Sequence, residues 1–259
     1  MKRLFFALLL VPFLGVAAHA QVPDLESLIP SGDAAATGRI VQLVAILTVL
    51  SIAPGLLIMV TSFTRFIIAL SFLRSGLGLQ GTPGNLVLIS LSLFMTFYVM
   101  GPTLDRAWTE GLQPLTNNEI TEQEAFERIT DPFHDFMLTQ VRPKDLQLFA
   151  DLSASKPGAE DGTELVLPET GAEATQAQSV PLRVLIPAFM ISELRRGFEI
   201  GFLIVLPFLV IDMIVATLVM SMGMMMMPPA VIALPFKILF FVLIDGWNLL
   251  VGGLVRSFF

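Results

Sequence analysis

The stretch GFLIVLPFLVIDMIVATLVMSMGMMMMPPAVIALPFK, residues 201–237, decides the fold class of this chain. Two apolar segments are separated by four consecutive methionines, Met224 to Met227, and by the double proline that follows them. Consecutive helix positions point in four directions, so one packed face cannot take all four side chains. Methionine is flexible and suits surfaces that re-pack around changing partners. The run therefore indicates either a soft constriction at a helix end or gap-filling packing within a membrane helix.

The composition is that of an integral membrane protein. Of the 259 residues, 54% are apolar and 14% are charged, against roughly 25% charged in soluble proteins. Mean hydropathy is +0.78. The chain has no cysteine, which excludes a disulfide framework, a thiolate nucleophile and a cysteine-ligated metal. Its histidines are His19 and His134, too few for a convincing Ser-His-Asp triad or zinc site, so we expect neither an enzyme nor a metal centre.

The first residues are typical of a secretory signal. Two basic residues precede an apolar segment from Leu4 to Val16, which is too short to span a bilayer comfortably. Ala18-His19-Ala20 has the small-x-small pattern of a cleavage site. The sequence predicts a cleaved signal peptide over residues 1–20 and an exported leader over residues 21–39. An uncleaved signal anchor is the alternative.

Residues 40–104 are expected to hold two apolar helices. The first apolar zone runs from about Ile40 to Leu73 and contains a Pro-Gly pair that bends or interrupts a helix. The second, Leu86 to Gly101, is short for a full span. With an exported leader, the positive-inside rule places Arg65 and Arg74 on the cytoplasmic side. The second helix then returns outward.

Residues 105–182 form a polar, acidic insert. Between Asp105 and Glu173 there are 15 acidic and five basic residues, a net charge of −10. Since their spacing matches no calcium-binding loop, we interpret these carboxylates as a solvated face. Residues 153–179 are rich in Ala, Gly, Glu, Thr and Pro, which predicts a flexible loop.

The first part of the insert has helix-like spacing of its apolar residues, from Glu119 to Leu152. Thr121 and Glu124 are spaced as a capping box, which predicts a helix start at this position. Thr130-Asp131-Pro132 predicts a break and a restart.

Residues 183–259 are expected to carry the third and fourth apolar helices, Gly201 to Met222 and Ala230 to Val251. Asp212 lies in the third, and Lys237 and Asp245 lie in the fourth. A charge at such depth costs about 2.5 to 3.5 kcal/mol on insertion scales, so it normally faces a partner or water. Because the chain offers few internal partners, we expect these charges to be buried against other subunits.

Four charged residues precede the third helix. Glu193 with Arg196, and Arg195 with Glu199, have the spacing of local helix pairs. If the insert is outside, Arg195 and Arg196 are also outside, against the positive-inside bias. We therefore expect a multi-subunit assembly that carries the chain partly out of the lipid plane.

Most of the chain from Leu43 to Arg256 resembles the FliP family of flagellar type III export-gate proteins. The resemblance lies in four long motifs: TRFIIALSFLRSGLG (64–78), TPGNLVLISLSLFMTF (82–97), GMMMMPPAVIALPFK (223–237) and VLIDGWNLL (242–250). Virulence-secretion members of the family typically lack a cleaved signal and a leader. Residues 1–20 therefore favour the flagellar branch.

The resemblance implies an all-α protein of kinked helical hairpins that assembles, as a pentamer, with FliQ and FliR into a right-handed helical cone. FlhB, FlhA and FliO are the implied neighbours. The cone belongs to the flagellar basal body in the bacterial inner membrane, and the acidic insert is exposed to the periplasm. No cofactor or nucleic acid is implied. A cone standing above the membrane plane would resolve the conflict at Arg195 and Arg196.

The implied function is to conduct unfolded flagellar subunits through a central pore. The family's methionine constriction maps onto Met224, Met225 and Met226, which would seal the closed pore. Candidate inter-subunit charge contacts map onto Glu193, Asp212 and Lys237. The alternative is an ion- or proton-coupled secondary transporter that uses the buried charges. Such a transporter should show repeated halves, and the sequence has no such repeat.

Overall fold

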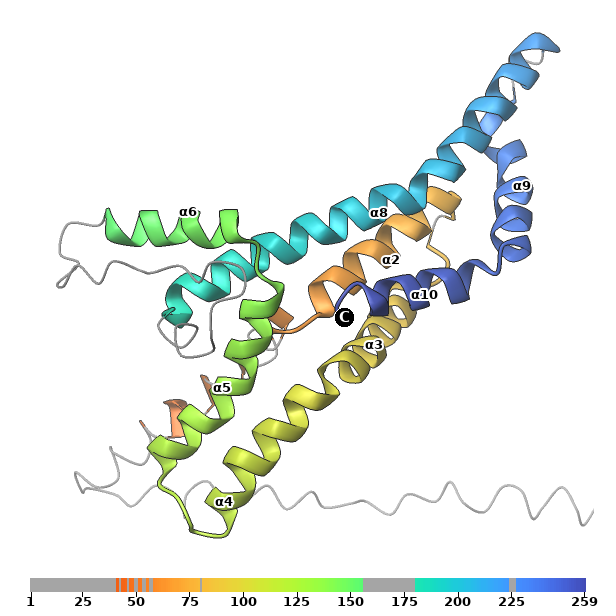
Figure 1. Ribbon diagram of the computed structural model, residues 1–259. Helices are drawn as coiled ribbons and strands as arrows, with labels where there is room; N and C mark the ends of the chain where they lie inside the picture. Colours follow the sequence, from red (N-terminus) through yellow and green to blue (C-terminus); the bar gives the residue numbers. More distant parts are fainter. Residues whose placement is uncertain are drawn as a thin grey trace, which may run out of the picture. The chain divides into compact units, whose positions relative to one another are not determined.

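The computed structural model in Figure 1 describes residues 58–79, 81–155, 180–223 and 227–259, with scattered helical residues between 41 and 55. The chain divides into two compact units, Met1–Ala53 and Pro54–Phe259, and the features below belong to the second. Within the described ranges the regular structure is helical and contains no strand, so the predicted all-α class is confirmed. The predicted signal peptide and leader (1–39), residues 156–179 of the predicted loop and Met224–Met226 lie outside the described residues.

The helices follow one another in a simple order, shown in Figure 1. They are α2 (Phe63–Leu77), α3 (Asn85–Arg106), the π-helical segment η2 (Ala107–Leu112), α4 (Gln113–Thr116), α5 (Glu122–Gln140), α6 (Pro143–Ala154), α8 (Leu182–Ser221), α9 (Pro229–Leu243) and α10 (Gly246–Arg256).

The closest packing is between α2 and α8, which lie side by side (Figure 1). Glycines bring the two backbones together. A Cβ atom added to Gly201 of α8 would lie 2.6 Å from Cγ of Phe72, and one on Gly76 of α2 would lie 3.0 Å from Cδ2 of Phe208. Small residues at a helix interface allow this approach, and dispersion contacts then replace the missing hydrophobic driving force in lipid. The interface leads into a core of α2, α3, α8 and α10 residues, including Phe66, Leu70 and Leu254.

The third predicted helix is much longer than expected. The prediction began it at Gly201, but α8 runs without a break for 40 residues and passes through Pro187 and Pro207. Each proline removes one backbone hydrogen bond, but the packing of α8 against α2, α5, α6 and α9 holds the helix together. At about 1.5 Å per residue α8 is about 60 Å long, twice the roughly 30 Å of a bilayer's hydrocarbon core. An upright α8 must therefore extend well beyond the lipid.

The second predicted helix is also longer than expected. The prediction ended it at Gly101, before Pro102, but α3 continues to Arg106 and through η2 and α4 to Thr116, 32 residues in all. The beginning of the acidic insert is thus the end of an apolar helix. Arg106 stabilises this extension because it forms ion pairs with Glu110, one turn on, and with Asp135 of α5.

The helical part of the insert forms α5 and α6. The predicted cap is confirmed: the Thr121 hydroxyl accepts a hydrogen bond of 3.3 Å from the Glu124 backbone N–H. The predicted break at Thr130-Asp131-Pro132 is wrong, because α5 continues through Pro132, a buried residue. Burial of that ring outweighs the lost backbone hydrogen bond.

The fourth predicted helix is two helices. The pair α9 and α10 bends by 65° at Asp245, whose backbone is left-handed (φ 52°, ψ 51°). Asn248 donates a hydrogen bond to the Asp245 carboxylate across the bend. A side chain on Gly246 would collide with the ring of Phe241, so the bend requires glycine there. By length and composition, two helices of the described part can cross a membrane, or three if α9 and α10 form one bent span.

The glycine interface gives the first prediction. Gly201→Ala should destabilise the chain by about 1 to 3 kcal/mol, because the new methyl group overlaps the Phe72 side chain and forces α2 and α8 apart. Thermal unfolding of the purified chain in detergent measures the effect. Gly101→Ala is the matched control: it lies inside α3 with no atom within 4 Å of its Cβ position, so it should be neutral or stabilising. Equal destabilisation by both variants would contradict the packing argument.

Candidate functional site

The deepest polar feature of the chain is an ion pair between Arg65 of α2 and Glu193 of α8. Both side chains are completely buried. Nε of Arg65 donates to Oε2 of Glu193 at 2.8 Å, and Nη2 of Arg65 donates to Oε1. This two-bond arrangement fits the planar fork of a guanidinium to a carboxylate, which is the strongest form of such a pair. It joins residues 128 positions apart in the sequence.

The remaining donors of Arg65 are also used. Nη1 donates to the backbone oxygen of Ser257 at 2.8 Å and to its hydroxyl at 3.0 Å. Nη2 also donates to Oε1 of Gln140 at 3.1 Å. The guanidinium carbon lies 3.5 Å from the centre of the Phe258 ring, a cation–π contact. A buried charge is tolerated when it is paired and hydrogen-bonded in this way.

These contacts correct three predictions. Arg65 lies inside the protein instead of anchoring a helix end at a membrane surface. Glu193 pairs with Arg65 and not with Arg196, whose Nη1 donates to Gln140 at 3.1 Å. The other local pair is confirmed, since Nε of Arg195 lies 2.9 Å from Oε1 of Glu199. Tertiary packing overrode the i, i+3 spacing because a fully buried carboxylate gains more from a fork-like partner.

A second ion pair joins α8 to α9. Nζ of Lys237 donates to Oδ2 of Asp212 at 2.6 Å and to the backbone oxygen of Gly76 at 3.0 Å. The Lys237 side chain is 5% exposed and that of Asp212 is 36% exposed. The expectation of inter-subunit contacts assumed that these charges lack partners within the chain, and that assumption is wrong. Oδ1 of Asp212 is buried and has no hydrogen-bond partner in the described part of the chain.

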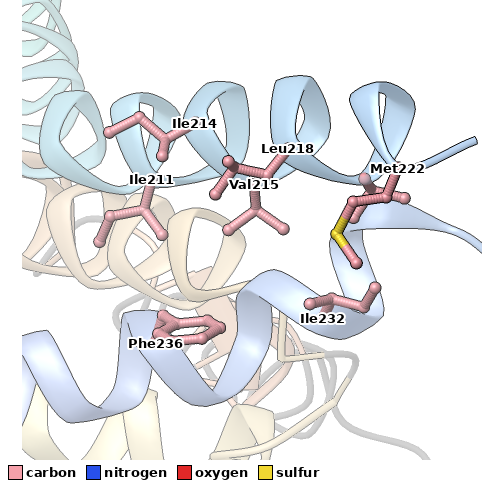
Figure 2. Close-up of a pocket in the computed structure, with 8 residues that line it drawn as sticks. Ile211, Ile214, Val215, Leu218, Met222, Ile232 and Phe236 are labelled. Carbon is pink, nitrogen blue, oxygen red and sulfur yellow. The ribbon is translucent and has the colours of Figure 1, made fainter.

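An apolar pocket lies beside this second pair, between the end of α8 and the start of α9 (Figure 2). Its volume is about 530 Å³. The lining is entirely aliphatic, aromatic or thioether: Ile211, Ile214, Val215, Leu218, Val219, Met222, Ile232 and Phe236. Ile211 and Phe236 adjoin Asp212 and Lys237 in the sequence, so the pocket and the ion pair share one helix junction. The sequence suggested the apolar helices but not the gap between them.

Methionines are exposed around the same junction. Met213, Met220, Met222 and Met227 are 45% to 69% exposed. The predicted seal residues, Met224, Met225 and Met226, belong to the connection between α8 and α9 by sequence. An exposed run of flexible thioethers at the end of an apolar hairpin offers a soft, re-packable surface.

The charged residues of the described part are arranged in pairs. No group of three or more His, Asp or Glu side chains in that part is placed to hold a metal ion. Sequence reasoning selected Glu193, Asp212 and Lys237, but it missed Arg65 as a site residue and it missed Gln140 and Phe258 altogether. Arg65 carried a signal, a charge within an apolar zone. Gln140 and Phe258 carried none.

The fold and site define a class: all-helical proteins of the membrane type, whose long apolar helices are joined by internal ion pairs and end in a methionine-rich hairpin connection. The model of the FliP family matches residues 46–254, most of the chain. The chain belongs to the FliP family.

Similar proteins support this assignment along almost the whole length. The chain is 55% identical over 253 residues to the flagellar biosynthetic protein FliP of Rhizobium meliloti (strain 1021), covering 98% of this chain and 97% of the relative. It is 58% identical over 245 residues to the protein of that name from Agrobacterium fabrum, covering 94% of both. With the Bacillus subtilis protein it shares 45% over 235 residues, 91% of this chain and 99% of the relative.

The buried pair gives a second prediction. Arg65→Met should destabilise the chain by about 3 to 5 kcal/mol, because it leaves the Glu193 carboxylate buried without a counter-charge. The double variant Arg65→Met with Glu193→Leu should recover most of that loss. Denaturant unfolding of the purified chain in detergent measures both.

The exposed pair of Arg195 and Glu199 is the control for this prediction. Both side chains are more than half exposed, so Arg195→Gln should cost less than about 1 kcal/mol. A loss for Arg65→Met as small as that for Arg195→Gln would show that the buried pair is not required for stability.

The second ion pair gives a third prediction. Lys237→Ala should cost about 1 to 3 kcal/mol, since it removes a charge-assisted hydrogen bond from a carboxylate that is partly exposed. The swap of Asp212→Lys with Lys237→Asp should regain part of this stability in the monomeric chain, though not the bond to the Gly76 oxygen. Recovery that appeared only in an assembled particle would instead assign the interaction to neighbouring subunits.

Proposed function

We propose that this chain is a pore-forming subunit of the flagellar type III protein export gate. Membership of the FliP family makes it a component of flagellar biosynthesis and export. In the proposed function, copies of the chain surround a pore through which unfolded flagellar subunits cross the bacterial inner membrane. The role is not enzymatic, and it requires no cofactor.

The observation that carries the proposal is the methionine-rich connection between α8 and α9. The described methionines that flank it, Met222 and Met227, are exposed, although side chains of this size are usually buried in a folded chain. Several copies of Met224, Met225 and Met226 around an axis would form an apolar ring. An apolar constriction excludes water and ions by dewetting, and flexible thioethers can move aside for a polypeptide and close behind it.

The helix lengths support a complex that extends beyond the membrane. A helix of 40 residues is far longer than a lipid span requires. Many large apolar side chains along α3, α8 and α9 are exposed in the single chain, among them Phe94, Phe198 and Leu239. In the proposal they pack against other copies, a pentamer by family resemblance, and against FliQ and FliR. FlhB, FlhA and FliO complete the neighbours, and the insert that contains α5 and α6 faces the periplasm.

The proposed inter-subunit charges need a new ranking. The carboxylate of Glu193 and the ammonium of Lys237 are committed to partners within the chain. Asp212 retains an unpartnered oxygen and a partly exposed side chain. We infer that, of the three residues, Asp212 is the one that contacts a neighbouring subunit.

The fourth prediction tests the seal. Replacing Met224, Met225 and Met226 together by Ala should widen the ring and admit small ions without preventing assembly, because a smaller side chain removes apolar bulk from the constriction. Ion conductance of cells that express the variant, measured together with its assembly state, is the test. Met213→Ala, an exposed methionine within α8, is the control and should stay ion-tight.

Two outcomes separate the alternatives. A fully assembled triple variant that stays ion-tight would remove the seal. Packing alone predicts lost stability with no leak. A secondary transporter that used Asp212 and Lys237 would lose substrate movement in variants of those residues and be indifferent to the methionines.

A further inference from the structure

Phe258, two residues beyond α10, is held from one side by α5. Phe136 and Gln140 lie four residues apart, on one face of α5. Nε2 of Gln140 donates a hydrogen bond of 3.1 Å to the backbone oxygen of Phe258. The ring of Phe136 stacks on the ring of Phe258, with 6.2 Å between centroids and 21° between planes. One helix face therefore binds both the backbone and the side chain of this residue.

From the other side, Phe258 is held by α2. The Arg65 guanidinium lies over its ring, and the ring of Phe66 lies 5.2 Å away between centroids. Arg65 also binds the preceding residue, Ser257, through two hydrogen bonds. Phe258 is consequently 8% exposed, while the next residue, Phe259, is 84% exposed. The docking is confined to Ser257 and Phe258.

Gln140 is the shared partner of these contacts. Its Oε1 accepts one hydrogen bond from Arg65 of α2 and another from Arg196 of α8, each 3.1 Å long. Its Nε2 donates to Phe258. An amide can accept and donate at once, whereas a carboxylate only accepts and an ammonium only donates. The position therefore requires an amide to join α2, α5, α8 and the segment after α10.

We propose that Phe136 and Gln140 form a clasp on Ser257–Phe258 that couples the polar insert to the bent pair α9–α10. The docked residues follow α10 directly, so a shift of α10 strains or breaks the Gln140 bond and the ring stack. A shift of α5 acts on α10 through the same contacts. Because α9 carries Lys237 and follows the methionine connection, the clasp links the insert to that connection mechanically. The coupling does not depend on the proposed pore.

Gln140→Glu in the full chain tests the clasp. The variant retains an acceptor for both arginines but loses the donor to Phe258 and puts a carboxylate against its carbonyl. Hydrogen exchange in residues 254–259 should accelerate roughly three- to tenfold, the range for loss of one hydrogen bond. Exchange in α6 should not change. Gln147→Glu, which makes the same charge change at an exposed position of α6, is the matched control and should leave residues 254–259 as they are.

Coupling must also be reciprocal. Phe258→Leu removes the stack on Phe136, so exchange at the end of α5, residues 133–141, should accelerate while α6 again stays constant. This second variant decides the matter if Gln140→Glu does not fold. Unchanged exchange at the far partner in either folded variant, or an equal rise in α6, would overturn the proposal.

Discussion

The pair of Arg65 and Glu193 is the constraint on which the rest of this structure depends. Removing two charges from water is expensive, and their attraction repays the cost only when the geometry is good and the remaining donors are satisfied. Here the partners are supplied by α2, α8, α5 and the segment after α10. Each of these elements must be in place before the guanidinium is fully bonded. The ion pair therefore favours one arrangement of helices over the many that apolar surfaces alone would permit.

The α2–α8 interface shows how the chain brings those charges together. Glycines at 76, 197 and 201 remove side-chain bulk where the two helices cross, and Ile68, Phe72 and Phe208 occupy the space. Close backbone approach lets Arg65 reach across to Glu193. The same long α8 then continues to Asp212, where the second ion pair secures α9. One helix thus connects a rigid, hydrogen-bonded region to an apolar junction with a pocket and exposed methionines (Figure 2).

These two regions differ in the physical character that their functions require. Around Arg65, directional bonds specify a single geometry. Around Met222, the contacts are non-directional and the side chains are flexible, so the surface can accept different neighbours at little cost. A fixed scaffold beside an adaptable tip suits a component of flagellar protein export. The bend at Asp245 lies between the two, because α9 is tied to the tip and α10 leads to the rigid region.

The sequence by itself determined the membrane-type composition, the all-α class, the family, the cap at Thr121 and the pair of Arg195 and Glu199. These depend on composition or on neighbours within a turn or two, which the order of residues states directly. It did not determine where α3, α5 and α8 end, because the prolines at 102, 132 and 187 are breakers only when packing does not compensate for the lost hydrogen bond. Nor did it determine the partners of Glu193 and Lys237. Those partners lie 128 and 25 residues away, and only the tertiary structure brings them within hydrogen-bond distance.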